Sequence, residues 1–99
     1  MHIVINTLSI KPDADWATLA RLFDGFCDGA RPDHPGLVGA QIVQSGPEEA
    51  ILIISFSDAE TMASFSSTVA APWFAEHVRP FLAGPANRKT GAVVAGFPR

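Results

Sequence analysis

The stretch that most constrains this chain runs from Ile51 to Glu60 and reads Ile-Leu-Ile-Ile-Ser-Phe-Ser-Asp-Ala-Glu. Its first half has the β-branched and aromatic residues of a strand, but apolar residues do not alternate with polar ones. A strand of this kind is covered on both of its faces. The remaining sequence supplies helices for only one face, so we expect a second copy of the chain to cover the other.

Length and composition support one small domain that pairs with itself. The 99 residues predict a single domain spanning positions 1–99, and charged residues make up only 17% of them, against the roughly 25% usual for globular chains. So little charge leaves apolar surface uncovered, which favours a homodimer. The formal charge of −3 comes with no basic stripe, which argues against a nucleic-acid partner.

No feature of the sequence directs the chain to a membrane or to an oxidising compartment. The longest apolar run is too short for a membrane span, and strand residues follow Met1 directly, so we expect no signal peptide. A single cysteine, Cys27, forms no internal disulfide. We therefore expect a cytoplasmic protein.

Hydrophobic periodicity and turn residues set the order of the elements. Apolar residues at intervals of three and four predict a helix between the first two strands, with Asp13 as its N-cap. The turn Ser45-Gly46-Pro47-Glu48-Glu49 makes the strands on either side antiparallel neighbours. We expect strands at about 2–10, 37–44, 50–56 and 89–97, and a first helix that ends near residue 30.

The second helical region follows the third strand directly. Either Ser57 and Glu60 form a capping box at its start, or Asp58 caps it alone. Pro72 predicts a break or kink, with a separate short helix over residues 73–78. The order β-α-β-β-α-β predicts a ferredoxin-like α+β fold, with both helices on one face of an antiparallel sheet.

Two side chains are candidates for catalysis. Asn6 stands among apolar residues of the first strand, where an amide either bonds to a neighbouring element or donates into a cavity between sheet and helices. His77 follows the aromatic pair after Pro72. It is a candidate general base or haem ligand, or else a partly exposed histidine paired with Glu76 or Glu60.

Aromatic and basic residues supply candidate binding groups. The aromatic candidates for a pocket lining are Phe23, Phe26, Phe65, Trp73, Phe74 and Phe81. Of these we expect Phe23, Phe65, Trp73 and Phe74 to line the pocket, although ordinary core packing is the alternative for most of them. Arg79, Arg88 and Lys89 are candidates to receive an anionic substituent; solvated surface is the alternative, and for Lys89 it is the interpretation we adopt. The histidines and Cys27 have no metal-ligand spacing, so we expect no metal site.

Several common catalytic motifs are missing from the sequence. There is no glycine-rich phosphate loop, no dinucleotide fingerprint and no Gly-x-Ser-x-Gly nucleophile site. If the chain is an enzyme, much of the reactivity comes from the substrate or from a bound cofactor.

Four segments carry a resemblance to a known family over nearly the whole chain. They are Val4-Ile5-Asn6-Thr7-Leu8, Pro35-Gly36-Leu37-Val38-Gly39, Ile54-Ser55-Phe56-Ser57-Asp58-Ala59-Glu60 and the segment around His77. In these the chain resembles the antibiotic biosynthesis monooxygenase family of dimeric α+β barrels. The resemblance supports the fold better than it supports a function.

The resemblance implies oxygenation of a small phenolic, quinone-like or polyketide-type aromatic substrate, with dioxygen as co-substrate and without flavin or metal. Asn6 and His77 would then stabilise the substrate anion and transfer protons. A haem-degrading branch of the family is similar too, with His77 near the place of the iron ligand. That branch has a tryptophan where this chain has Phe65, which weakens the haem interpretation. A non-catalytic homodimer that binds a small ligand is the third possibility.

Overall fold

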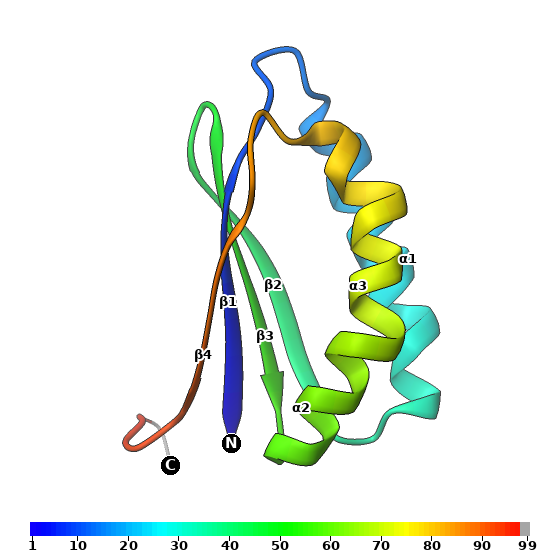
Figure 1. The fold of residues 1–99 in the computed structure, drawn as a ribbon, viewed down its shortest axis with the longest axis vertical. Helices are drawn as coiled ribbons and strands as arrows, with labels where there is room; N and C mark the ends of the chain where they lie inside the picture. The colour runs from blue at the N-terminus through cyan, green and yellow to red at the C-terminus, as the bar shows by residue number, and fades with distance from the viewer. Residues whose placement is uncertain (98–99) are drawn as a thin grey trace.

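The computed structural model describes residues 1–97 and forms two layers, a sheet and a layer of helices (Figure 1). The strands are β1 (His2–Ser9), β2 (Leu37–Gly46), β3 (Glu49–Phe56) and β4 (Asn87–Ala92), in the sheet order β2-β3-β1-β4. Every neighbouring pair is antiparallel. Together with the helices, this order is the predicted ferredoxin-like α+β fold.

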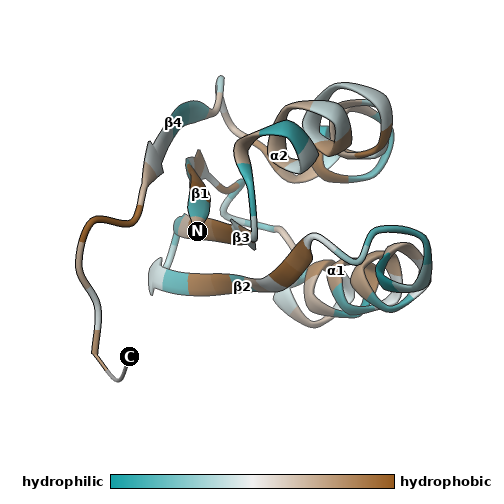
Figure 2. Ribbon diagram, turned by 90° about the horizontal axis from the view of Figure 1, so that it is seen from below, coloured by the Kyte–Doolittle hydropathy of each residue, from teal (hydrophilic) through white to brown (hydrophobic). Residues whose placement is uncertain are grey.

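Both helical regions cover the same face of the sheet (Figure 2). One is α1 (Trp16–Ala30), and the other runs from α2 (Ala59–Phe65) through α3 (Ala71–Trp73). A short 3-10 turn, Arg31–Asp33, follows α1. Apolar residues from all these elements form one core between the layers, where Phe56, Phe65, Leu8, Ile10 and Leu19 are the largest fully buried side chains.

The two faces of β3 are covered to different extents. Ala50, Leu52, Ile54 and Phe56 point into the core and are buried, whereas Ile51 and Ile53 point to the opposite face and stay partly exposed. Ile5 of β1 lies beside Ile53 on that outer face and is 41% exposed. The uninterrupted apolar sequence of β3 therefore has protein cover on one side only within this chain.

The helices begin at aspartates. Asp15, not the predicted Asp13, caps α1, because Asp13 lies in the turn that leads from β1 and Asp15 is the last extended residue. Hydrogen bonds from the Thr18 hydroxyl and amide, and from the Ala17 amide, lower the pKa of Asp15. Asp58 alone caps α2, as the second of the two predictions had it, and the Thr61 amide and hydroxyl lower its pKa.

Pro72 does not divide the second helical region into two helices, so the predicted break with a separate helix over residues 73–78 is wrong. The backbone stays in the right-handed helical conformation from α2 into α3 and on to a 3-10 turn at Arg79–Phe81. A π-helical turn, Ser66–Ala70, precedes the proline, and the Ala71 amide donates to the Ser66 carbonyl five residues back. This wider turn accommodates a ring that would clash in a regular α-helix. A second π-helical turn spans Phe74–Val78.

The last strand is shorter than predicted at its C-terminal end. β4 pairs only with β1, and its final pair is Ala92 with His2. The Val93 amide still donates to the Met1 carbonyl at 2.8 Å, after which β1 offers no further partner. The following segment leaves the sheet on the side away from the helices (Figure 2), and there Val94 is 96% and Phe97 99% exposed.

Candidate functional site

A cavity of about 330 Å³ lies between the sheet and the helices. This volume is near the lower end of the range for small-molecule sites. The wall is mostly apolar. Its lining residues come from all layers of the fold: Val4, Asn6, Phe23, Phe26, Leu52, Ile54, Ser66, Ala70, Ala71, Trp73, Phe74, Arg79, Ala86 and Arg88.

Asn6 reaches this cavity because of its place in β1. Its flanking inner-face residues, Val4 and Leu8, are buried, and its partners across the sheet are Leu52 of β3 and Arg88 of β4. Within residues 1–97 the side-chain amide of Asn6 makes no hydrogen bond. A partly buried amide without a protein partner is free to bond to a ligand. The position of Asn6 thus fits the interpretation in which its amide donates into a cavity between sheet and helices.

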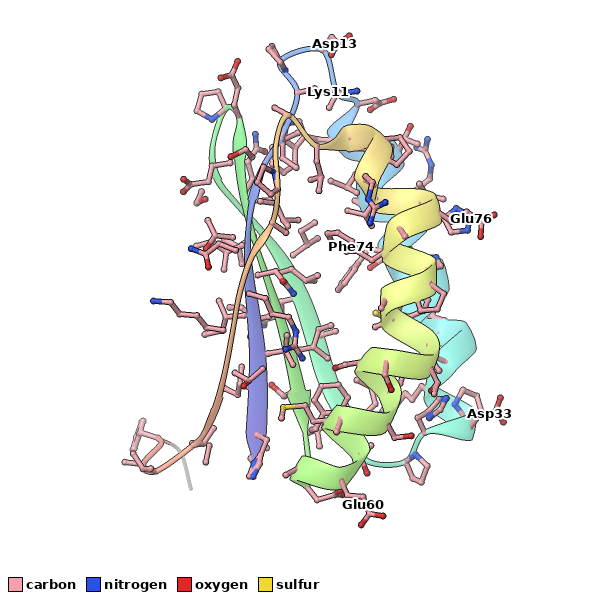
Figure 3. All side chains as sticks on the ribbon, in the orientation of Figure 1. Lys11, Asp13, Asp33, Glu60, Phe74 and Glu76 are labelled. Carbon is pink, nitrogen blue, oxygen red and sulfur yellow. The ribbon has the colours of Figure 1, made fainter. Side chains whose placement is uncertain are left out.

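Aromatic rings form one wall of the cavity. Trp73 stacks on Phe26, with 4.2 Å between ring centroids and 19° between ring planes. Phe74 points from the helical segment toward the sheet (Figure 3). Phe23 of α1 completes the wall. Three of the four aromatic residues predicted from the sequence therefore line the cavity.

Phe65 has a different place from the predicted one. It is 1% exposed and is not among the lining residues. Its ring packs against Phe56 and Phe26, with centroids 5.6 and 5.9 Å away, and against His34. Phe65 is therefore a core residue, which is the alternative that the sequence left open. Phe26 occupies the cavity wall instead.

His77 also lies outside the cavity lining. Its imidazole packs on Trp73 at 5.7 Å between centroids, and its Nε2 is 3.8 Å from a carboxylate oxygen of Glu76. The side chain is 40% exposed, and Glu76 points away from the sheet (Figure 3). This arrangement is the alternative in which a partly exposed histidine pairs with Glu76. Because His77 does not line the cavity, its direct role there stays a prediction.

Two arginines give the cavity its charge. Both were candidates from the sequence: Arg79 enters from the end of the second π-helical turn, and Arg88 enters from β4. The Nη2 of Arg88 donates to the hydroxyl of Ser66 at 3.4 Å, which is a long hydrogen bond. Ser66 gave no signal in the sequence, because only the π-helical turn brings it to the lining.

The described residues lining the cavity include no histidine, cysteine, methionine or carboxylate. Haem iron in proteins is held by histidine, cysteine, methionine or tyrosine, so this lining does not fit a haem. Elsewhere in residues 1–97, no group of three or more histidine, cysteine or acidic side chains is placed to hold a metal ion. The chemistry that the lining offers is hydrogen bonding by one amide and one hydroxyl and positive charge from two arginines.

Comparisons with solved structures identify the fold. SnoaB, a cofactor-independent oxygenase from Streptomyces nogalater, superposes with a TM-score of 0.75 at 11% identity, over 99% of this chain and 97% of that one. The chain has the fold of the antibiotic biosynthesis monooxygenases. A structure named antibiotic biosynthesis monooxygenase gives a TM-score of 0.73 at 18% identity, over 96% of this chain and all of the other.

Rv0793 from Mycobacterium tuberculosis has the same fold, with a TM-score of 0.73 at 19% identity and 97% coverage of both chains. No protein-family model matches the sequence, and no curated protein matches it. The resemblance seen in the sequence is thus confirmed at the level of fold. In the part of the chain that the structure describes, no helix is long and apolar enough to cross a membrane.

Proposed function

We propose that the chain is a cofactor-independent monooxygenase whose substrate is a small aromatic molecule with an ionisable hydroxyl group. The observation that carries this proposal is the unpartnered amide of Asn6 in an aromatic cavity with two arginines. An amide N–H and nearby positive charge stabilise a phenolate or enolate oxygen. The named neighbours with this fold add support, since SnoaB is a cofactor-independent oxygenase.

The reaction balances without a further reductant. The substrate anion gives one electron to dioxygen, and the resulting radical and superoxide combine at a ring carbon that carries hydrogen. The peroxide anion so formed takes up one proton from water, which restores the proton lost when the hydroxyl ionised. The hydroperoxide then loses water, so that one oxygen atom remains as a new carbonyl and the other leaves as water. The apolar wall would keep bulk water from the anion while it reacts.

The lining implies how the substrate loses its proton. Its described residues include no histidine or carboxylate to act as a base, whereas Arg79 and Arg88 favour the ionised form of a bound hydroxyl by Coulomb attraction. We infer that the substrate ionises through water at the cavity mouth. The pH dependence of turnover should then follow the pKa of the substrate and change from one substrate to another.

Oxygen uptake with a panel of hydroquinones and anthrones tests the function. Asn6→Leu removes the donor while keeping similar size, and we expect kcat to fall about 100-fold, as for loss of one oxyanion donor. Gln44→Leu also replaces a side-chain amide with leucine, at an exposed position of β2 that does not line the cavity, and should leave kcat unchanged. Equal rates in the two variants would contradict the assignment of Asn6.

His77→Ala decides whether the predicted proton transfer by His77 takes place. If the imidazole acts through the Trp73 contact, the variant loses turnover and changes the pH profile; a pure packing role leaves the profile alone. Aromatic ligands that bind without any oxygen uptake would replace the monooxygenase proposal with that of a ligand-binding protein.

We also propose that the chain works as a homodimer. The outer face of the sheet carries exposed Ile5 and Val43, each 41% exposed, beside the partly exposed Ile51 and Ile53. No helix in the described residues covers this face (Figure 2). Pairing of two such faces would remove apolar surface from water, and the exposed segment that contains Val94 would extend over the second copy.

A further inference from the structure

The charge inside the cavity is opposite to the charge of the whole chain. The sequence has 10 acidic and 7 basic residues, a formal charge of −3. Among the described lining residues, however, both charged side chains are arginines, Arg79 and Arg88, and no carboxylate joins them. A cleft with one sign of charge and apolar walls concentrates ligands of the opposite sign. The cavity therefore favours negatively charged ligands, although the chain as a whole is negatively charged.

Arg88 points to the helices because of its register. It pairs with Asn6 on the inner face of the sheet, whereas the next residue, Lys89, pairs with Ile5 on the outer face. Charged residues on edge strands commonly prevent edge-to-edge pairing with a strand of another molecule, a role that suits Lys89 on the edge strand β4. Arg88 makes a long hydrogen bond to Ser66 and no ion pair within residues 1–97. Most of its N–H donors remain free for a ligand.

Arg79 borders two hollows. A second hollow of about 520 Å³ lies under the loop that follows the helical segment, and it shares Phe74, Arg79 and Ala86 with the main cavity. Both arginines are exposed residues, while Asn6 is only partly exposed. The donors are thus ordered, with the neutral amide deeper and the guanidinium groups nearer to solvent.

We propose that the natural ligand carries a carboxylate in addition to the aromatic hydroxyl, and that Arg79 and Arg88 hold this carboxylate at the mouth of the cavity. The proposal rests on the proposed function in taking this cavity as the substrate site. Guanidinium groups match the planar carboxylate with paired N–H donors. At the partly hydrated mouth the carboxylate avoids the desolvation cost that it would meet on the apolar floor. The ring then lies along Trp73 and Phe74, and the hydroxyl reaches Asn6. Because two guanidinium groups face a single carboxylate, a net positive charge remains at the cavity and still favours the ionised hydroxyl.

Isothermal titration calorimetry with two ligands of equal shape tests the proposal. 2-Naphthoate is anionic at neutral pH, and 2-naphthamide is its uncharged counterpart. We expect the native protein to bind the naphthoate at least about 5-fold more tightly, and added salt to reduce this preference. Arg79→Gln and Arg88→Gln should each weaken naphthoate binding by about 5- to 30-fold, as expected for a partly exposed charged hydrogen bond. Binding of the amide should change by less than about 2-fold in both variants, because it loses no charge interaction.

Two controls separate the ligand effect from a general loss of charge or of fold. Arg21→Gln removes the same side chain from the exposed face of α1, where it bonds to Thr18, and should leave both affinities unchanged. Arg88→Lys keeps the charge but not the paired donors, and should recover part of the affinity. Unchanged binding of the amide shows that a variant still has a folded cavity.

Three results would overturn the proposal: equal affinity for the two ligands, no naphthoate binding by the native protein at millimolar concentration, or equal behaviour of Arg88→Gln and Arg21→Gln. In each of these cases, oxygen uptake with uncharged hydroquinones would leave the monooxygenase proposal intact. Conversely, if the protein prefers the naphthoate but no substrate gives oxygen uptake, the carboxylate site is supported and the monooxygenase proposal is refuted.

Discussion

Gly36 lies against the start of the second helical region, and this contact makes a measurable prediction. A Cβ added at Gly36 would be 2.6 Å from both Cγ2 and Oγ1 of Thr61 and 2.9 Å from its Cβ. Carbon atoms in good contact are about 3.5–4.0 Å apart, so the overlap is on the order of 1 Å. Rotating Thr61 would break its hydrogen bond to Asp58 and would still leave the Cβ contact too short.

Gly36→Ala should therefore cost about 1–3 kcal/mol of unfolding free energy, the range for overpacking. The strain outweighs the gain of about 0.4–1 kcal/mol that the loss of a glycine gives through the unfolded state. Urea denaturation followed by circular dichroism measures the change, at one fixed protein concentration because the proposed dimer makes stability depend on it.

Gly39→Ala is the matched control, because a Cβ there meets nothing within 4 Å. We expect this variant to be neutral or slightly more stable. Thr61→Gly removes all three contacting atoms, so Gly36→Ala should cost little in that background, and the double-mutant cycle gives the coupling. If Gly36→Ala behaves as Gly39→Ala does, or costs the same with and without the Thr61 side chain, the reasoning from this contact is refuted.

Burial, exposure and capping each lead to a further expected outcome. Phe65→Ala removes a ring that is 1% exposed and should cost about 3–5 kcal/mol in urea denaturation; a loss below about 1 kcal/mol would show that the ring is not packed as described. Ile5→Asp places a charge on the exposed outer sheet face, and sedimentation velocity should then show a monomer; a dimer of unchanged affinity would place the interface elsewhere. Hydrogen bonds lower the pKa of Asp15 and Asp58 below the ordinary 3.8, so their stabilisation is complete above that pH and is lost as pH falls through the lowered folded pKa. Asp15→Asn together with Asp58→Asn should weaken the dependence of Tm on pH below about pH 4. If the Tm of this double variant falls with pH as steeply as the Tm of the native protein, the sign of the argument is contradicted.

The sequence predicted the fold well because the fold depends on local signals. The apolar run of β3, the short turn before it and the helical stripe of α1 each fix one element and its neighbour. The end of β4 was missed, because it depends on where β1 begins and not on the apolar character of Val93 and Val94. Strand length in a sheet is set by the partner as well as by the strand itself.

Part of the cavity lining was predicted from local signals in the same way. Asn6 was a candidate because it is an amide among apolar strand residues, although the sequence left open which face of the sheet it lies on, and Trp73 and Phe74 were candidates because they follow Pro72. We expected His77 at the cavity because we expected a helix break at Pro72. The helical backbone instead continues through the π-helical turns, and His77 packs on Trp73 outside the cavity lining. Sequence spacing assumes 3.6 residues per turn, so it misassigns faces wherever the turns widen.

The wall opposite the strands combines the aromatic rings with three small side chains, Ser66, Ala70 and Ala71, on and next to the first π-helical turn. The room for a ligand therefore depends on what these three positions leave vacant, while the groups that would meet its oxygen atoms belong to other elements. Larger side chains at these three positions would reduce the size of the ring system that fits, without moving Asn6 or either arginine. Ligand size and reaction chemistry can thus diverge independently among proteins built on this plan.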